Sequence, residues 1–294
     1  PVAADGLIFE TGGYTLAGTQ PLVLNGPETM IDQKNHGATI NAPLTGLGGI
    51  AVAGTGTLTL GGSSNYNGAT AVRVGTLALA GGDNRLPKGT VLTLGDGGSV
   101  NVGVLKLNGC NQEFTGLSTA GFEGYNNNGL FAGNRVLNGS ATPCTLTLNI
   151  ESGLNNQFVG TLGGSGQYDN NFAVKKTGGG TLWLGRSANW TGGTTIEEGA
   201  LEMSSVWWQG NEASGTFRIG KGATFAVSGV VSPLTFNGVT VEFLSGGAGT
   251  LTNRGSWDWF DWKANGGMTI RSTGGERNLF NAAPNYSLVI NWYD

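Results

Sequence analysis

A single histidine, His36, limits the catalytic chemistry open to this 294-residue chain. Nucleophilic catalysis by Ser–His–Asp or Cys–His groups and histidine-rich zinc sites all require imidazole. His36 lies in the polar stretch Asp32-Gln33-Lys34-Asn35-His36-Gly37, which is typical of an exposed turn. We therefore expect no imidazole-based catalysis.

Paired carboxylates are the other candidate for catalysis, because two of them flank the bond that a glycosidase cleaves. The candidates are Glu151, Glu197 with Glu198, and Asp258 with Asp261. Glu197 and Glu198 are adjacent at the end of a predicted strand, so their side chains would point to opposite faces. We expect solvated carboxylates and no enzyme activity.

Calcium would find oxygen ligands in two glycine-rich turns, Asp83-Asn84 and Gly95-Asp96-Gly97. The nine-residue repeat of calcium-binding β-helices is missing, however. We predict that the chain holds no metal and no cofactor.

Aromatic residues form the most unusual local clusters. Exposed indoles could stack on sugar rings, which would suit an adhesin, or they could cap one end of the fold or dock on another subunit. The pattern favours capping or docking, and both functions stay open for the same set: Trp207, Trp208, Trp257, Trp259, Phe260, Trp262, Trp292 and Tyr293.

The two cysteines, Cys110 and Cys144, lie in polar, Gly/Asn-rich surroundings. We predict that they form a disulfide, which would stabilise the fold by roughly 3 to 4 kcal/mol and would indicate an oxidising compartment. The alternative is two unrelated buried thiols. Asn-x-Ser/Thr triplets at Asn138, Asn189 and Asn285 are expected by chance in this composition.

The elements that must position these residues are short strands. Glycine occurs 55 times and only 12% of the residues are charged, which fits a chain that turns every few residues. Apolar residues alternate with Thr, Ser, Asn or Lys in many short segments, as they do in strands with one buried face. A net charge of −4 without a Lys/Arg cluster argues against nucleic-acid binding, and no apolar run is long enough for membrane insertion.

A gapless internal repeat decides between the all-β architectures. Residues 56–61 (GTLTLG) return at 180–185 (GTLWLG), a separation of 124 residues, and the following Asn, aromatic, Gly and Thr positions return with them. A second correspondence, Leu94-Gly95-Asp96-Gly97 with Ile219-Gly220-Lys221-Gly222, has nearly the same separation. Such repetition is typical of a stacked unit with rungs of roughly 20 to 25 residues.

The repeat resembles the autotransporter-associated β-strand repeat of bacterial surface proteins, both at Gly54–Leu77 and, more closely, at Gly178–Met203. This resemblance implies an all-β, single-stranded, right-handed parallel β-helix (β-solenoid) that is extracellular or at the cell surface. It supplies no catalytic residues.

We predict solenoid rungs in two related blocks over residues 1–254, and a terminal aromatic-rich cap or assembly segment of the same domain over 255–294. Strand-like sequences at both ends, Val2–Leu16 and Tyr286–Tyr293, could pair with a second copy. The predicted function is a structural subunit of a head-to-tail homopolymeric surface filament, with the chain as its own partner. The alternative is a monomeric adhesin or carbohydrate-binding passenger domain that contacts glycans.

Overall fold

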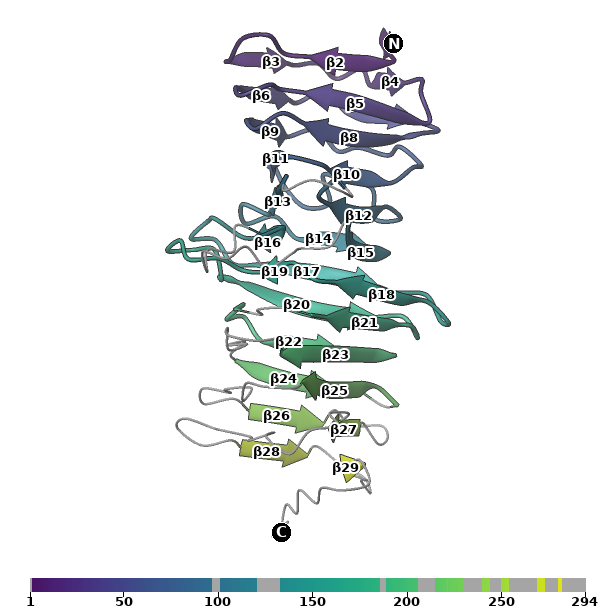
Figure 1. The fold of residues 1–294 in the computed structure, drawn as a ribbon, viewed down its shortest axis with the longest axis vertical. Helices are drawn as coiled ribbons and strands as arrows, with labels where there is room; N and C mark the ends of the chain where they lie inside the picture. Colours follow the sequence, from purple (N-terminus) through teal and green to yellow (C-terminus); the bar gives the residue numbers. More distant parts are fainter. Residues whose placement is uncertain are drawn as a thin grey trace.

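The computed structural model describes residues 2–96, 101–120, 133–185, 189–205, 215–220, 222–229, 240–243, 250–253, 269–272 and 280–281. Across these residues the secondary structure is strand and turn without helix, and the paired strands are parallel. The strands stack into an elongated rod from the N-terminal end downward (Figure 1). The predicted all-β parallel β-helix is therefore confirmed.

The strands of the described residues form five sheets, and the strands of each sheet follow one another along the rod. Sheet A contains β1 (Val2–Ala4), β4 (Leu22–Leu24) and β7 (Leu44–Gly46). Sheet B contains β2 (Gly6–Ile8), β5 (Glu28–Asp32), β8 (Gly49–Ala53), β10 (Thr70–Val72), β12 (Val91–Leu94) and β15 (Gly116–Thr119). Sheet C contains β3 (Tyr14–Leu16), β6 (Gly37–Ile40), β9 (Thr57–Leu60), β11 (Gly75–Leu79), β13 (Gly103–Lys106), β16 (Arg135–Leu137) and β19 (Thr161–Leu162).

Two further sheets form the C-terminal part of the rod. Sheet D contains β14 (Gln112–Phe114), β17 (Cys144–Asn149), β20 (Phe172–Thr177), β22 (Thr194–Ile196), β24 (Thr216–Ile219), β26 (Thr240–Phe243) and β28 (Thr269–Ser272). Sheet E contains β18 (Asn155–Phe158), β21 (Thr181–Leu184), β23 (Ala200–Ser205), β25 (Thr224–Gly229), β27 (Thr250–Asn253) and β29 (Phe280–Asn281).

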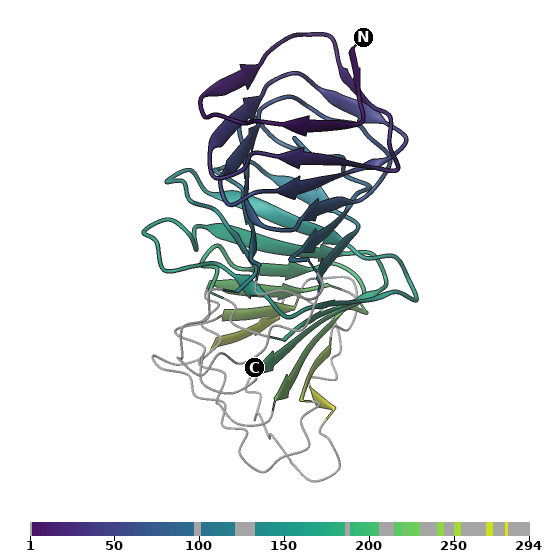
Figure 2. The same ribbon diagram turned by 45° about the horizontal axis from the view of Figure 1, so that its top comes forward.

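The rod has three faces, and the first of them runs from sheet A into sheet D. Between β7 and β14 this face consists of irregular backbone that still bonds rung to rung, through Asn65 N to Leu44 O (2.9 Å), Ser64 N to Arg85 O (3.0 Å) and Asn84 N to Asn111 O (2.8 Å). Figure 2, in which the N-terminal end comes forward, shows the chain winding around the axis through these faces.

The second face runs from sheet B into sheet E. Its last strand in sheet B, β15, lies against β18, the first strand of sheet E. The side chain of Asn156 joins them, because its Oδ1 accepts a hydrogen bond from Leu117 N (3.1 Å). The third face is sheet C, which continues below β19 through Asn189 N to Leu162 O (2.8 Å).

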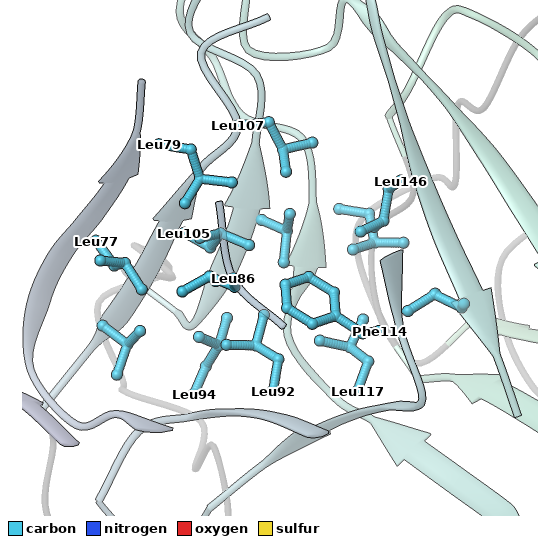
Figure 3. Packing of buried hydrophobic residues seen from close by; sticks show 14 of the residues in the cluster. Leu77, Leu79, Leu86, Leu92, Leu94, Leu105, Leu107, Phe114, Leu117 and Leu146 are labelled. Carbon is cyan, nitrogen blue, oxygen red and sulfur yellow. The ribbon is translucent and has the colours of Figure 1, made fainter. Parts of the chain in front are cut away.

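Inward-facing aliphatic side chains form continuous columns along the axis, as the alternating pattern predicted. One column follows the register of sheet C and contains the buried residues Leu58, Leu77, Leu105, Val136 and Leu162. Leucines from neighbouring faces point toward one another inside the coil (Figure 3). Each such side chain contributes about 1.5–3 kcal/mol when it is removed from water, so these columns hold the rungs together.

Rung length varies along the rod. In the first copy of the repeat the register pairs Leu58 with Leu77, which makes a short rung. At the start of sheet D the register pairs Gln112 with Leu146, a step along the chain that is almost twice as long. The predicted rung of roughly 20 to 25 residues is thus close for the repeat itself and too short for the middle of the chain.

The two copies of the repeat lie on different faces. Strands β8 to β11 of the first copy alternate between sheets B and C, whereas β20 to β23 of the second alternate between sheets D and E. The loop after β9 therefore crosses the face of sheets A and D, while the equivalent loop after β21 crosses the face of sheet C. The separation between the copies is not a whole number of rungs, and the second copy is turned by one face around the axis.

Candidate functional site

Each copy of the repeat has a buried aromatic corner. Tyr66 bonds through its hydroxyl to Thr70 Oγ1, and Trp190 donates from Nε1 to Thr194 Oγ1 (2.9 Å). Both rings are almost fully buried, and burial raises the pKa of Tyr66. These aromatic residues fix the corner of the rung and are not available to a ligand.

At a second corner, the two copies of the repeat differ in which inward position carries a polar side chain. In the first copy the side chain of Gln33, from the rung above, donates from Nε2 to Gly54 O (2.9 Å), and Val52 faces the core. In the second copy Lys176 stands at the position of Val52, 124 residues further along the chain. Ile150 takes the place of Gln33 in the rung above, because Ile150 N bonds to Thr177 O (3.0 Å) as Gln33 N bonds to Ala53 O (3.2 Å). The two copies therefore differ at both positions together.

Lys176 takes over the role of Gln33 in this second corner. Its Nζ donates to Thr177 O and Gly178 O, each at 2.7 Å, and the side chain is fully buried. Burial lowers the pKa of Lys176 to about 8, against the opposing attraction of Glu198. The lysine is explained by the two carbonyl groups that it satisfies, and so it is a structural residue.

The outer face of sheet E carries an aromatic residue that the sequence reasoning missed. Trp183 lies at the outward position of β21, in register with Gln157 above and Glu202 below. It is half-buried and its ring occupies the space over Gly185, where an added Cβ would lie 2.4 Å from Trp183 Cζ3. The signal was present in the repeat, because the equivalent outward residue of the first copy is Thr59.

The arrangement around Trp183 has the chemistry of a contact surface. The indole lies on the sheet beside an exposed amide and a half-buried carboxylate, one from each adjacent rung. Adjacent parallel strands are about 4.8 Å apart, so these three side chains present apolar and hydrogen-bonding groups within one small area. We call the set Trp183, Gln157 and Glu202 the Trp183 surface.

The candidates for catalysis are dispersed. His36 lies in a turn, where its backbone N–H donates a hydrogen bond to Gln33 O (2.9 Å). Glu197 is exposed and pairs with Lys175 (2.8 Å), while Glu198 and Glu151 are exposed at separate turns. Asp258 and Asp261 lie outside the described residues.

The two candidate calcium-binding turns, which we predicted to hold no metal, use their carboxylates in hydrogen bonds within the protein. Asp83 accepts hydrogen bonds from Asn111 through both carboxylate oxygens, each at 2.9 Å, and these bonds lower the pKa of Asp83. Asp96 accepts a bond from Asn101 Nδ2 (2.7 Å). Within the part of the chain that the structure describes, no group of three or more His, Cys, Asp or Glu residues could hold a metal ion.

Asn138 is fully buried, although it begins an Asn-x-Ser triplet. Its Nδ2 donates to Ser140 O, Thr142 O and Asn171 O, and its Oδ1 accepts from Gly109 N (2.6 Å). The folded chain therefore cannot be glycosylated at this position.

Cys110 and Cys144 are both buried free thiols in the structure. They lie on consecutive rungs near the start of sheet D, and the predicted disulfide between them stays a prediction. The eight aromatic residues predicted to contact an interface or a glycan, from Trp207 to Tyr293, lie outside the described residues. The proposed division at residue 255 also stays a prediction.

A rod of parallel strands with repeated aromatic–threonine corners defines a parallel β-helix of the repeat-containing type. The passenger-associated-transport-repeat family model matches residues 51–79 and 174–203, the same two copies that the internal repeat identifies. These matches identify the two copies as passenger-associated transport repeats, which are typical of autotransporter passenger domains, and the location of the chain is extracellular or at the cell surface.

A curated relative supports this assignment over nearly the whole chain. The adhesin BmaC autotransporter of Brucella suis biovar 1 (strain 1330) is 30% identical over 297 residues, which cover 97% of this chain and 8% of the relative. The chain thus spans a small part of that protein's length. No solved structure matches the chain. Among the described residues there is no helix with the length and apolarity that a membrane crossing requires.

Proposed function

We propose that this chain is a non-enzymatic adhesive element in which the β-helix is a rigid support and the Trp183 surface contacts a glycan. The similarity to an autotransporter adhesin supports the adhesive role. The single observation that carries the glycan contact is Trp183 itself, an indole placed on the outside of a strand where the first copy of the repeat has Thr59.

The chemistry of the Trp183 surface favours a neutral sugar. The flat apolar face of a pyranose ring can stack on an indole, while amide and carboxylate oxygens accept bonds from its hydroxyl groups. A net charge of −4 and the carboxylate of Glu202 disfavour sulfated or uronic-acid chains. The parallel strands hold these groups at fixed spacing, so little conformational entropy is lost on binding.

Glycan binding by the purified chain tests this function. Chitohexaose and cellohexaose serve as neutral probes, and a heparin hexasaccharide serves as the acidic control. We expect binding of a neutral probe that falls at least tenfold in the Trp183→Thr variant, which carries the residue of the first copy. Thr59→Ala, an outward change on the other copy, should leave affinity unchanged. Equal affinity of the Trp183→Thr variant and the unmodified chain would contradict the proposal.

End-to-end association into the head-to-tail filament is a second candidate function. The rungs of the rod already stack by parallel strand pairing, as between β1 and β4 or between β2 and β5. A second copy could add its strands to the stack through the same kind of pairing.

Light scattering over a concentration series, with negative-stain microscopy, tests this association. A filament should lengthen as the protein concentration rises, because each added copy extends the stack of strands. A monodisperse monomer at high concentration would contradict the filament and would leave glycan binding unaffected.

A further inference from the structure

We propose that Cys110 and Cys144 form a disulfide bond between consecutive rungs of the exported chain. The register of sheet D carries this inference. Gln112 pairs with Leu146 in the parallel ladder of β14 and β17, and each cysteine lies two residues before its member of that pair. The two cysteines are therefore in-register neighbours on adjacent rungs.

Both side chains also point the same way. Gln112 and Phe114 are buried on β14, and Leu146 is buried on β17, so the cysteines two residues earlier share the inward side. Each cysteine is 5% exposed and belongs to the hydrophobic core. No other cysteine occurs in the chain, so the pairing has a single intramolecular solution.

The spacing of stacked strands suits the bond. Adjacent parallel strands lie about 4.8 Å apart, which falls within the range of about 4.4–6.8 Å between the Cα atoms of bonded cysteines. Cys110 precedes β14 in a turn closed by its own N–H bonding to Leu107 O (2.9 Å). Because a turn adjusts more easily than a strand interior, the two sulfurs can reach bonding distance with a small local shift.

The bond would stabilise the part of the rod where the chain makes its longest turn. Among the described ladders, the step from Gln112 to Leu146 is the longest between two paired residues, and β14 is the first strand of sheet D. A cross-link here restricts the unfolded chain over this long segment. It joins the first two rungs of sheet D at the level where the face of sheets A and D becomes regular again.

The chemistry requires an oxidant, which we assign to a protein disulfide of a thiol oxidase outside the cytoplasm. One cysteine thiolate attacks that disulfide and forms a mixed disulfide, and the second thiolate then displaces the oxidase sulfur. Two cysteine thiols lose two protons and two electrons, and the oxidase disulfide becomes two thiols. The location of the chain outside the cell is compatible with this step.

The order of folding and oxidation follows from burial. Burial raises the pKa of Cys144 to about 12, with Cys110 adding to the effect and the Gly109 N–H opposing it. Thiolate is the reactive form, so exchange is slow once the rungs have closed around the sulfurs. The bond should therefore form while the chain folds and should afterwards resist reductants that act only on the folded protein.

Peptide mapping of the full chain refolded with oxidised glutathione, without reduction, tests the bond. We expect a cross-linked pair of peptides containing Cys110 and Cys144 and resistance to maleimide until denaturant and reductant are both present. Reduction in denaturant, followed by refolding without an oxidant, should lower the Tm by roughly 5–10 °C. The Cys110→Ala/Cys144→Ala variant should have the lower Tm with or without reductant.

Two outcomes would overturn the proposal. One is a refolded chain in which both cysteines react with maleimide after denaturation without reductant. The other is a cross-link that forms only between chains, seen as a covalent dimer. Since the double variant removes both sulfurs, a difference between its oxidised and reduced samples would show that the Tm shift has another source.

Discussion

The corner beside Gly54 in the first copy and the corner beside Gly178 in the second are stabilised by different side chains. Gln33 and Val52 in the first copy are replaced by Ile150 and Lys176 in the second, and this difference can be tested by mutation. Replacing Lys176 with valine, the residue of the first copy, has two opposing effects. It removes a buried ammonium and leaves Gly178 O without the 2.7 Å bond that it now accepts. The orphaned carbonyl costs about 1–3 kcal/mol.

Burial of the Lys176 ammonium lowers the free energy of unfolding by an amount that depends on pH. Its pKa is about 8 in the folded chain against 10.5 as the reference value. Between these values the unfolded chain binds more protons than the folded chain, so the stability of the wild type rises with pH in this window. From pH 7 to pH 10 the rise amounts to about 2.5 kcal/mol. The Lys176→Val variant lacks this group and should lack the rise.

Urea unfolding of both proteins at several values between pH 7 and pH 10 measures this effect, because the other titrating groups are common to both and cancel. The stability of the wild type relative to Lys176→Val should increase by about 2.5 kcal/mol over that range. A difference that stays flat would refute the idea that Lys176 is held as a buried ammonium.

A double-mutant cycle tests the compensation itself. Ile150→Gln supplies the amide that the first copy uses, so it should be better tolerated in the Lys176→Val background than in the wild type. The expected coupling is about 1–3 kcal/mol, the value of one buried carbonyl. Additive effects within about 0.5 kcal/mol would show that the two positions act independently.

Three further predictions concern single residues of the rungs. Gly199→Ala should cost at least about 3 kcal/mol, because φ is +65° and the new Cβ would lie 2.2 Å from a carbonyl oxygen, whereas Gly89→Ala meets open space and serves as the control in thermal unfolding. Tyr66→Phe should cost about 1–2 kcal/mol in urea unfolding, because Thr70 loses a buried partner. For Asp83, whose pKa is lowered, the advantage of wild type over Asp83→Asn should hold above pH 4 and vanish in acid; a pH-independent difference would contradict it.

The sequence predicted the inward side of the fold well because that side follows local rules. Alternation alone places Leu58, Leu77 and Leu105 on the core face, and the structure stacks them in one column. The glycine-rich turns and the repeat then indicate a solenoid, since each rung must turn and stack in the same way. These signals lie within a few residues of one another and do not depend on the register between distant rungs.

What the sequence could not predict depends on that register. The partnership of Gln33 with Gly54 and the alignment of Cys110 with Cys144 require the length of each rung, which almost doubles between the first repeat and the start of sheet D. Lys176 also contradicts its local pattern, because a charged residue stands at a position that alternation assigns to the core. Its carbonyl partners become visible only when neighbouring turns are in place.

The second copy is rotated by one face around the rod axis relative to the first, so the outer surfaces of the two copies point in different directions. The fold constrains inward positions and corners, so Tyr66 and Trp190 keep one role although they lie on different faces. Outward positions carry no such constraint, and Thr59 and Trp183 differ while their strands pair in the same way. Because the copies face different directions, an aromatic contact in one copy is not duplicated beside it. The repeat therefore builds the rod, and the outward residues are free to give each face its own chemistry.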